Sequence, residues 1–458
     1  MSVPFSKAYR ARLLHFTDVP DSASGAGFDY FEDGVLLVDR QGCVVTADHA
    51  EILIAQGLDE SACEHFPDQL LLPGLIDTHI HSSQTQVIAS HGEQLLDWLN
   101  RYTFPAERAF ADPEHAEREA ERFLDLLLAH GTTTAMVYTS VHPASTEAFF
   151  QAAHQRRMRM IAGKVMMDRN APPDLLDTPE SSARQSRALI ERWHQCDRLS
   201  YAVTPRFAPT SSAQQLELAG KIYRDYPGLY VQTHLSENQA ELAWVSELFP
   251  EARDYLDVYD RYGLLGERSV FGHGLYLGDA ELLRLAQTGS KVAFCPSSNL
   301  FLGSGLLDLE RLKARGVDVS LATDVGGGTS FSMLSTLAEA YKVLQLQGQK
   351  LDPLQAFYWV TLGNARALSL DHRIGNFMPG KEADFILVDL APTPLEAFRQ
   401  SQVDDLSEAL FALMLLGSER NIKRSYIMGE PVTVTAACQS VSRQDRKQKA
   451  EPDQSLGA

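Results

Sequence analysis

Short apolar or β-branched runs recur eight times along the chain between Leu71 and Asp324, mostly separated by longer amphipathic stretches. Runs of this kind are typical of buried strands, and their alternation with helical stretches is typical of parallel βα units. Eight repeats predict a closed (β/α)8 barrel of the TIM type. The runs are LLPGLID (71–77), TTTAMVY (132–138), RMIAGKVMM (159–167), LSYAVTPRF (199–207), LYVQTHL (229–235), SVFGH (269–273), KVAFCP (291–296) and DVSLATD (318–324).

Helix boundary signals support the barrel. Asp112 and Pro113 form an N-cap and first helical residue, and Gly131 ends the helix that they begin. Ser211 or Ser212 can cap a second helix in the same way. A doubly wound open sheet is the structural alternative, but it would not bring together polar residues at the ends of strands that are this far apart along the chain.

The segments on either side of the barrel are rich in strand patterns. Residues 9–70, 383–389 and 425–434 resemble short strands, whereas 353–370 and 404–416 resemble helices. Because the ends of a domain often lie close together, we expect the two flanks to form one small composite β-sandwich. The predicted parts are an N-terminal sandwich segment (1–70), the barrel (71–375), a C-terminal helix and strands (376–440) and a disordered polar tail (441–458).

The composition is that of a folded enzyme-sized protein. Hydrophobic residues make up 44% and charged residues 22% of the 458 residues. Lys plus Arg number 41 against 60 for Asp plus Glu, which gives a formal charge of −19. A net negative charge of this size disfavours nucleic acid and anionic lipid as partners.

Two further features bear on the compartment. No stretch of 18 apolar residues occurs and the N-terminus lacks an apolar leader, so we expect neither a membrane span nor export. The five cysteines contain no CxxC pair and their number is odd, which argues against both a disulfide framework and a cysteine zinc site. A reducing cytoplasm fits best.

The strongest local motif is the HxH of LPGLIDTHIHSSQ, in which His79 and His81 end the first barrel strand. Alternate residues of a strand share a face, so both imidazoles point the same way and can reach one ion. Such a pair occurs often by chance on surface strands. By itself it therefore predicts a metal site only weakly.

Polar residues at the ends of later strands strengthen the motif. His234 in QTHLSE, His273 in FGHG and Asp324 in ATDVGGG each stand at the carboxyl end of a predicted strand, where barrel active sites are built. A single one of them would more often be a core histidine or a helix-capping aspartate. Four strands that converge on one end predict a metal centre.

The donor types indicate the metal and its chemistry. Three neutral imidazoles (His79, His81, His234) and the carboxylate of Asp324 suit zinc, with a further position for water. Iron and manganese remain open on ligand type alone. A metal that acidifies water predicts a hydrolase. Glu237, three residues after His234, is placed to move protons at that water, although a lone glutamate here more often favours a helix dipole.

Three other candidates have stronger structural explanations. Lys164 resembles a carboxylated lysine that bridges two metals, but such a bridge is expected on the fourth strand, which has none; this favours one metal. Cys295 has no identifiable base beside it and fits a buried core position. The glycines 326–328 lack the pattern of a phosphate-binding loop.

At this point a family resemblance is clear. PGLIDTHIHSSQ, TPRFAPTSS, VQTHLSEN, CPSSNLFLGSG and ATDVGGGTSFSML resemble the amidohydrolase superfamily and, within it, the guanine deaminases, from about Asp29 to Ile386. PGKEADFILVD resembles the superfamily's return to the small β-domain. The resemblance implies one zinc ion per subunit, a homodimer, and guanine as the small-molecule substrate.

The resemblance also implies roles for individual residues. Zinc would be held by His79, His81, His234 and Asp324, while Glu237, His273 and Asp324 would be catalytic. The substrate contacts would be His81, Ser82, Ser83, Gln84, Arg206, Phe207, His234, Glu237 and Asp324. A guanidinium fork such as that of Arg206 can donate to the O6 and N7 edge of a purine, whereas the alternative for this residue is a structural salt bridge.

The implied reaction is the hydrolysis of guanine to xanthine and ammonia, in which a hydroxide on the metal attacks C2 and Glu237 transfers protons. The ligand set differs from that of base deaminases with an HxE and PCxxC signature, because the chain contains no PCxxC. Two alternatives stay open: a hydrolase of the same scaffold with another substrate, and a scaffold protein without catalysis.

Overall fold

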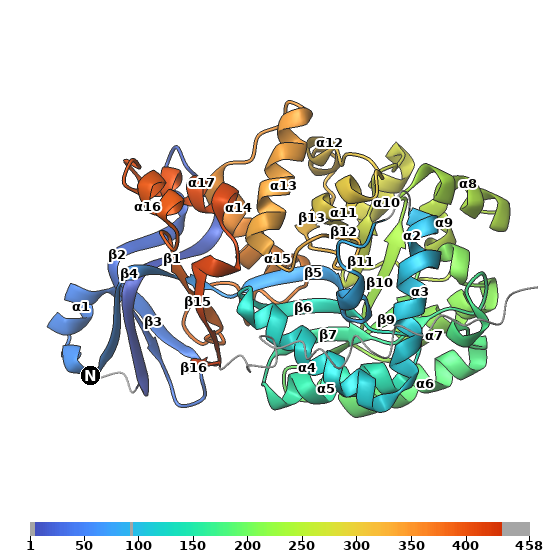
Figure 1. Cartoon of the computed structure of the whole chain (residues 1–458), viewed down its shortest axis with the longest axis horizontal. Coiled ribbons are helices and arrows are strands. Elements are labelled where there is room, and N and C mark those ends of the chain that lie inside the picture. The colour runs from blue at the N-terminus through green and yellow to red at the C-terminus, as the bar shows by residue number, and fades with distance from the viewer. Residues whose placement is uncertain (1–4, 92–94, 433–458) are drawn as a thin grey trace, which may run out of the picture.

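The structure is a computed structural model that describes residues 5–91 and 95–432. Figure 1 shows two parts side by side, a barrel and a smaller sheet domain that contains strands from both ends of the sequence. The predicted disordered tail (441–458) lies outside the described residues. Among the described residues, no helix combines the length and the apolar character that crossing a membrane requires.

Parallel strands form the barrel in the order in which they occur in the chain. Each short run places its apolar side chains between the strands and the surrounding helices, as a parallel sheet covered on one side by helices requires. The strands are β5 (Leu75–His81), β6 (Thr132–Tyr138), β7 (Arg159–Gly163), β9 (Ser200–Pro205), β10 (Tyr230–Leu235), β11 (Ser269–His273), β12 (Lys291–Phe294) and β13 (Asp318–Leu321), with the short β8 (Val165–Met166) beside β9.

Backbone hydrogen bonds between the first strand and the segment after the last strand close this sheet. The N–H of Asp324 donates to the carbonyl of His79 at 2.9 Å, and the N–H of His81 donates to the carbonyl of Val325 at 2.8 Å. Closure in this order confirms the predicted (β/α)8 barrel and excludes the open doubly wound sheet.

Helices cover the outside of the barrel or follow its strands. The predicted caps are present: Asp112 accepts from the N–H of Glu114, and Ser212 accepts from the N–H of Gln215. The helices are α2 (Leu95–Trp98), α3 (Phe104–Arg108), α4 (Pro113–Ala129), α5 (Pro143–Gln155), α6 (Pro179–Trp193), α7 (Ala213–Asp225), α8 (Gln239–Leu248), α9 (Tyr255–Asp260), α10 (Asp279–Thr288), α11 (Pro296–Phe301), α12 (Leu309–Ala314), α13 (Met333–Leu346), α14 (Pro353–Tyr358) and α15 (Asn364–Ala367).

The first predicted run, 71–77, is divided between the two parts of the molecule. Its beginning ends strand β4 (Cys63–Pro73) of the smaller sheet, and β5 of the barrel starts only at Leu75. Gly74 separates them, and a Cβ at this position would lie 2.1 Å from Oγ1 of Thr133. The close approach to the next barrel strand therefore requires glycine at the junction.

The smaller domain joins both terminal segments, as predicted. Its strands form one sheet in the order β16-β15-β14-β4-β1-β2-β3, in which N-terminal β4 pairs with C-terminal β14. Instead of two separate sheets of a sandwich, the structure has one sheet with register shifts in β1, and its aromatic core includes Tyr9, Phe385 and Tyr426. The elements are β1 (Lys7–Asp21), β2 (Ala26–Val38), β3 (Val44–His49), β14 (Phe385–Asp389), β15 (Ile422–Ile427), β16 (Glu430–Pro431), α1 (Ala50–Ala55), α16 (Pro394–Gln400) and α17 (Leu406–Leu416).

A buried ionic cluster connects the barrel to the smaller domain. Glu382, just before β14, accepts from Nε of Arg159 at 2.7 Å and from Nη2 of Arg198 at 2.6 Å, and Arg198 also contacts Asp384. The side chains of Arg159 and Arg198 are 8% and 4% exposed. Neither arginine can therefore recover its lost contacts from water if its carboxylate partner is removed.

We expect Glu382→Ala to lower the free energy of unfolding by about 3–5 kcal/mol, because it leaves a buried guanidinium without its carboxylate. Urea denaturation followed by circular dichroism measures the change. The control is Glu339→Ala, which removes an exposed ion pair with Lys342 on α13 and should cost less than about 1 kcal/mol. Equal effects of the two variants would contradict a structural role for the buried cluster.

Candidate active site

Five buried polar side chains meet at the carboxyl end of the barrel. They are His79 and His81 on β5, His234 on β10, His273 at the end of β11, and Asp324 after β13. Nε2 of His81 lies 3.2 Å and Nε2 of His79 lies 3.4 Å from Oδ1 of Asp324. Nε2 of His234 lies 3.3 Å from Nε2 of His81. The structure thus brings together the side chains that the motifs predicted at four separate strands.

The hydrogen bonds of these imidazoles leave their inner nitrogens available to a metal ion. His234 donates from Nδ1 to the carbonyl of Arg206 at 2.6 Å, so the lone pair of the neutral ring is on Nε2. Both ring nitrogens of His79 are buried and have no hydrogen-bond partner among the residues described, and Nε2 of His79 and Nε2 of His81 face Asp324. Buried polar atoms left without partners, arranged around one carboxylate, fit a metal centre.

The protonation states also fit metal ligands. Burial lowers the pKa of His81 to about 4 and lowers that of His234 well below its ordinary value. Burial alone would raise the pKa of Asp324, but the interactions with the neighbouring imidazoles of His79 and His81 outweigh it, and the pKa lies well below its ordinary value. His81 and His234 are therefore neutral and the carboxylate is ionised, as metal binding requires.

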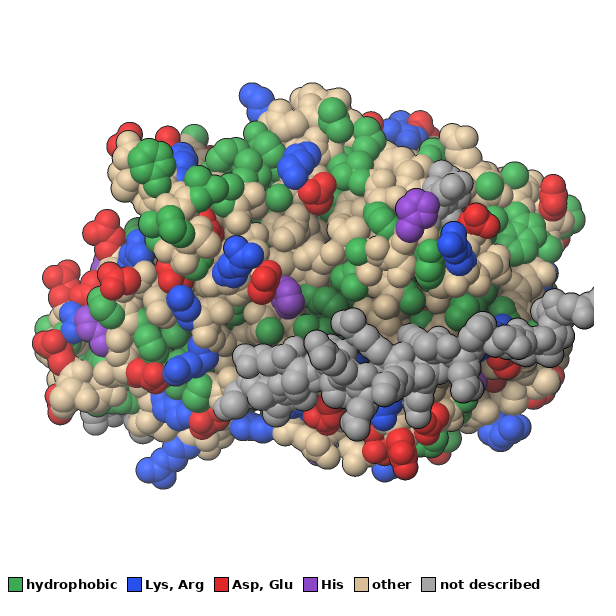
Figure 2. All heavy atoms as spheres, in the orientation of Figure 1, with side chains coloured by type: hydrophobic (Ala, Val, Ile, Leu, Met, Phe, Trp, Pro, Cys, Tyr) green, Lys and Arg blue, Asp and Glu red, His purple; other side chains and the backbone are tan. Residues whose placement is uncertain are grey.

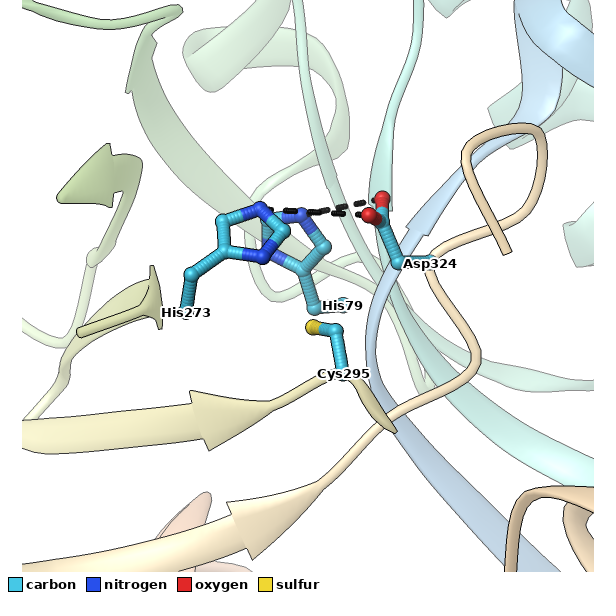
Figure 3. Close-up of side chains that lie close together, drawn as sticks. All are labelled: His79, His273, Cys295 and Asp324. Carbon is cyan, nitrogen blue, oxygen red and sulfur yellow. Dashed lines mark ion pairs between the residues drawn. The ribbon is translucent and has the colours of Figure 1, made fainter. Parts of the chain in front are cut away.

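Cys295 lies beside this group, and Figure 3 shows its thiol below the rings of His79 and His273, which point toward Asp324. The donor atoms of these four residues all lie within 4.8 Å of one another, as do those of the set His79, His81, His234 and Asp324. The two sets share His79 and Asp324, so they cannot both be filled. Burial raises the pKa of the Cys295 thiol well above its ordinary value, which favours the set with three imidazoles.

Glu237 faces the same point from the segment after β10. Its Oε2 lies 3.4 Å from Nε2 of His273. Burial, followed by the charges of Glu241 and Asp324, raises the pKa of Glu237 well above its ordinary value. A carboxyl group with a raised pKa can both hold and release a proton near neutral pH, which is what a general acid-base residue needs.

His273 is held in one orientation from behind. Its Nδ1 lies 2.9 Å from Oδ1 of Asn299, so the hydrogen is on Nδ1 and Nε2 faces Glu237 and Asp324. Asn299 belongs to the CPSSN segment, which the sequence did not mark as functional. A polar residue directly after a predicted barrel strand was the signal that could have revealed it.

A pocket opens beside this cluster of histidines and Asp324. Of the predicted substrate contacts, His81, Gln84, Arg206, Phe207, His234, Glu237 and Asp324 line it. Ser82 and Ser83 do not, because their hydroxyl groups donate to the backbone carbonyls of Tyr138 and Thr139 at the end of β6. The remaining lining residues are Leu95, Trp98, Leu99, His273, Leu302 and Gly327, and of these the sequence predicted a functional role only for His273.

Arg206 has two features that the sequence presented as alternatives. Its Nη1 donates to both carboxylate oxygens of Glu107, at 2.8 and 2.7 Å, which is a buried ion pair. It also lines the pocket. Glu107 is a functional candidate that the sequence did not reveal, because it stands in a short helix with no strand or metal motif nearby.

Comparisons with known proteins agree with this arrangement. The model of the amidohydrolase family matches residues 70–432. The chain belongs to the amidohydrolase family. It is 49% identical to guanine deaminase of Escherichia coli (strain K12), over 93% of this chain and 97% of that protein.

Solved structures give the same picture. The structure of E. coli guanine deaminase superposes with a TM-score of 0.91 at 48% identity, covering 93% of this chain and 99% of that chain. Guanine deaminase from C. acetobutylicum, solved with guanine bound in its active site, superposes with a TM-score of 0.84 at 26% identity, covering 93% and 100%. These relatives share the whole architecture of barrel and small domain.

Gly272 supplies a test of the metal centre. A Cβ at this position of β11 would lie 2.5 Å from Cε1 of His79, so Gly272→Ala must displace that imidazole. We expect the variant to fold but to retain less than about a tenth of the bound metal, since one ligand is moved. Elemental analysis of purified protein measures this. Gly348→Ala is the control, because a Cβ there meets no atom within 4 Å, although its φ of 70° causes local strain. Full metal content in Gly272→Ala would contradict the placement of His79.

Proposed function

We propose that this protein is a guanine deaminase that hydrolyses guanine to xanthine and ammonia. The observation that carries the proposal is the pocket itself. Metal donors, a carboxyl group with a raised pKa, and the side chains of Gln84, Arg206 and Phe207 all face one cavity. The similarity to guanine deaminases over nearly the whole chain supports the same substrate.

We propose one zinc ion per chain, held by His79, His81, His234 and Asp324. Three imidazoles and one carboxylate suit zinc, and the shared members of the two donor sets support a single ion. When bound, the ion supplies Lewis-acid chemistry and makes a bound water more acidic. The buried walls keep this chemistry in a region of low dielectric constant, where each charge acts strongly.

Glu237 moves the protons in the proposed reaction. It takes one proton from the water that adds to C2 and delivers it to a ring nitrogen of the purine. It then takes the second proton from the new hydroxyl group on C2, which becomes a carbonyl, and passes it to the amino group, which leaves as ammonia. Asp324, which stays ionised, and His273, which Asn299 orients, support the charge that develops in the same volume. Water is consumed and ammonia is released, so atoms and charge balance.

The side chains of Gln84, Arg206, Phe207 and Trp98, which line the same pocket as the proposed metal ligands, recognise the purine. Arg206 presents N–H groups that can donate to O6 and N7, which are both acceptors in guanine. Gln84 supplies an amide group, while Phe207 and Trp98 supply aromatic surface. A donor placed next to an acceptor matches the amide-like edge of guanine.

Turnover of guanine by the purified protein tests the proposal directly. We expect ammonia release and the absorbance change of xanthine formation with guanine, and at least about 10²-fold lower kcat/KM with adenine, cytosine or adenosine. Bound metal is determined on the same sample, and removal by a chelator should abolish turnover until zinc is returned. Turnover of another base in place of guanine would favour a different hydrolase. Protein that contains little bound metal and gains no activity when zinc is added would favour a scaffold protein.

Glu237→Gln tests the proton transfer. The amide keeps the shape of the side chain but cannot exchange protons, so kcat should fall by about 10²–10⁴-fold while the metal content stays unchanged. Steady-state kinetics with elemental analysis on the same preparation separates the two effects. Near-native kcat would remove Glu237 from the mechanism, and loss of metal would make it a structural residue.

We further propose a homodimer in the cytoplasm. Apolar side chains gather over α16 and α17 on the face shown in Figure 2, where Leu395, Phe398 and Leu416 are exposed. Exposed apolar surface of this kind favours a protein contact. Cys43, Cys63, Cys196 and Cys295 are all free thiols, which suits a reducing compartment. Light scattering that gives the mass of one chain would contradict the dimer.

A further inference from the structure

Glu107 is an acidic residue that is fully buried. It lies on α3, within the segment that also contributes Leu95, Trp98 and Leu99 to the pocket wall. Its side chain is 0% exposed. Burying a carboxylate is costly unless its oxygens are paired and hydrogen-bonded, so its partners indicate what it does.

Those partners are Arg206 and Gln84, two of the predicted substrate contacts. Nη1 of Arg206 donates to both oxygens, and Nε2 of Gln84 donates to Oε1 of the same carboxylate at 3.2 Å. Arg206 follows β9 and Gln84 follows β5, so one buried carboxylate connects groups from two strands and from the segment that covers them.

The contact with Arg206 uses only one corner of the guanidinium. Both hydrogen bonds come from Nη1, and the side chain is 4% exposed and lines the pocket. The fork is planar and rigid, so holding this corner fixes the directions of its other N–H groups. Arg206 is therefore presented to the substrate as a hydrogen-bond donor in one orientation.

The contact with Gln84 decides which end of its amide faces the substrate. A carboxylate accepts and does not donate, so the NH2 group must point to Glu107 and the carbonyl oxygen must point away from it. That oxygen accepts from the backbone N–H of Gly326 at 3.4 Å, which holds it in this orientation, and Gln84 lines the pocket. The second lone pair of the oxygen is the acceptor that Gln84 can offer to the substrate.

We propose that Glu107 is a positioning residue that makes the pocket selective for purines with a carbonyl group at C6. Guanine offers an acceptor at O6 and a donor at N1–H, which match the donor of Arg206 and the acceptor of Gln84. A purine with an amino group at C6 reverses both positions, since its amino group donates and its N1 accepts. Without Glu107 the amide of Gln84 is free to turn over, which relieves the mismatch at N1 but not the one between Arg206 and the amino group at C6. The inference rests on the proposed function.

The test compares two substrates that differ only at this edge. Guanine and 2,6-diaminopurine both carry the 2-amino group that is hydrolysed, whereas 2,6-diaminopurine has an amino group at C6. We expect the wild-type ratio of their kcat/KM values to be at least about 10³, because mispaired buried polar groups discriminate strongly. In Glu107→Gln the ratio should fall at least tenfold, with KM for guanine raised and metal content unchanged.

A matched variant separates this effect from the general loss of a buried ion pair. Glu119 on α4 is also buried, and both of its carboxylate oxygens accept from Nη1 of Arg122. It does not belong to the residues that line the pocket. Glu119→Gln should leave the substrate ratio unchanged. A purely structural role for Glu107 would lower activity toward both purines equally, and that outcome overturns the inference.

The remaining outcomes are distinct. If the wild-type protein turns over guanine but Glu107→Gln keeps the wild-type ratio, the inference fails and the proposed function stands. If the wild-type protein does not act on guanine, both fail. Should Glu107→Gln not yield folded protein, the ratio is measured on Glu107→Asp, whose carboxylate is one methylene shorter; a smaller ratio supports the inference and an unchanged one overturns it.

Discussion

The closure of the barrel at Asp324 is the constraint on which the rest of the site depends. Its backbone N–H completes the sheet against His79, and Oδ1 of its carboxylate lies 3.4 Å from Nε2 of His79 and 3.2 Å from Nε2 of His81. Asp324 therefore both connects the last strand to the first and contacts the imidazoles. A shift in barrel register would separate the metal donors, so the fold and the metal centre are fixed together.

The site contains features that reduce the stability of the free chain. His273 and Asp324 adopt left-handed backbone conformations, with φ of 73° and 52°, which cost on the order of 1 kcal/mol or more for residues other than glycine. The nitrogens of His79 lack hydrogen-bond partners among the described residues. Strain and unpaired polar atoms persist where binding requires them, and a metal ion satisfies the nitrogens that protein groups leave unpaired.

Much of this arrangement could be predicted from the sequence because it follows from periodic patterns. The eight strand runs predicted the barrel, and the polar residues at the ends of four of them predicted the cluster of histidines and Asp324, since parallel strands in a barrel end at one face. The HxH of His79 and His81 also depended on strand geometry alone. The bounds of the first strand were predicted less accurately, because Gly74 divides one apolar run between two domains.

The residues that line the pocket could be predicted only in part, because many of them lie in segments without a periodic hydrophobic pattern. Ser82 and Ser83 follow the HxH closely, yet the turn after β5 directs their hydroxyl groups to carbonyls of β6. Trp98 lies on the short helix α2 and Glu107 on the short helix α3, with the π-helical turn Leu99–Thr103 between them. None of these three segments carries a metal or strand motif. The partner of Arg206 lies 99 positions earlier in the chain, and only tertiary packing brings the two together. The proposed substrate contacts therefore depend on tertiary packing between distant segments, whereas the predicted metal ligands follow from the strand pattern.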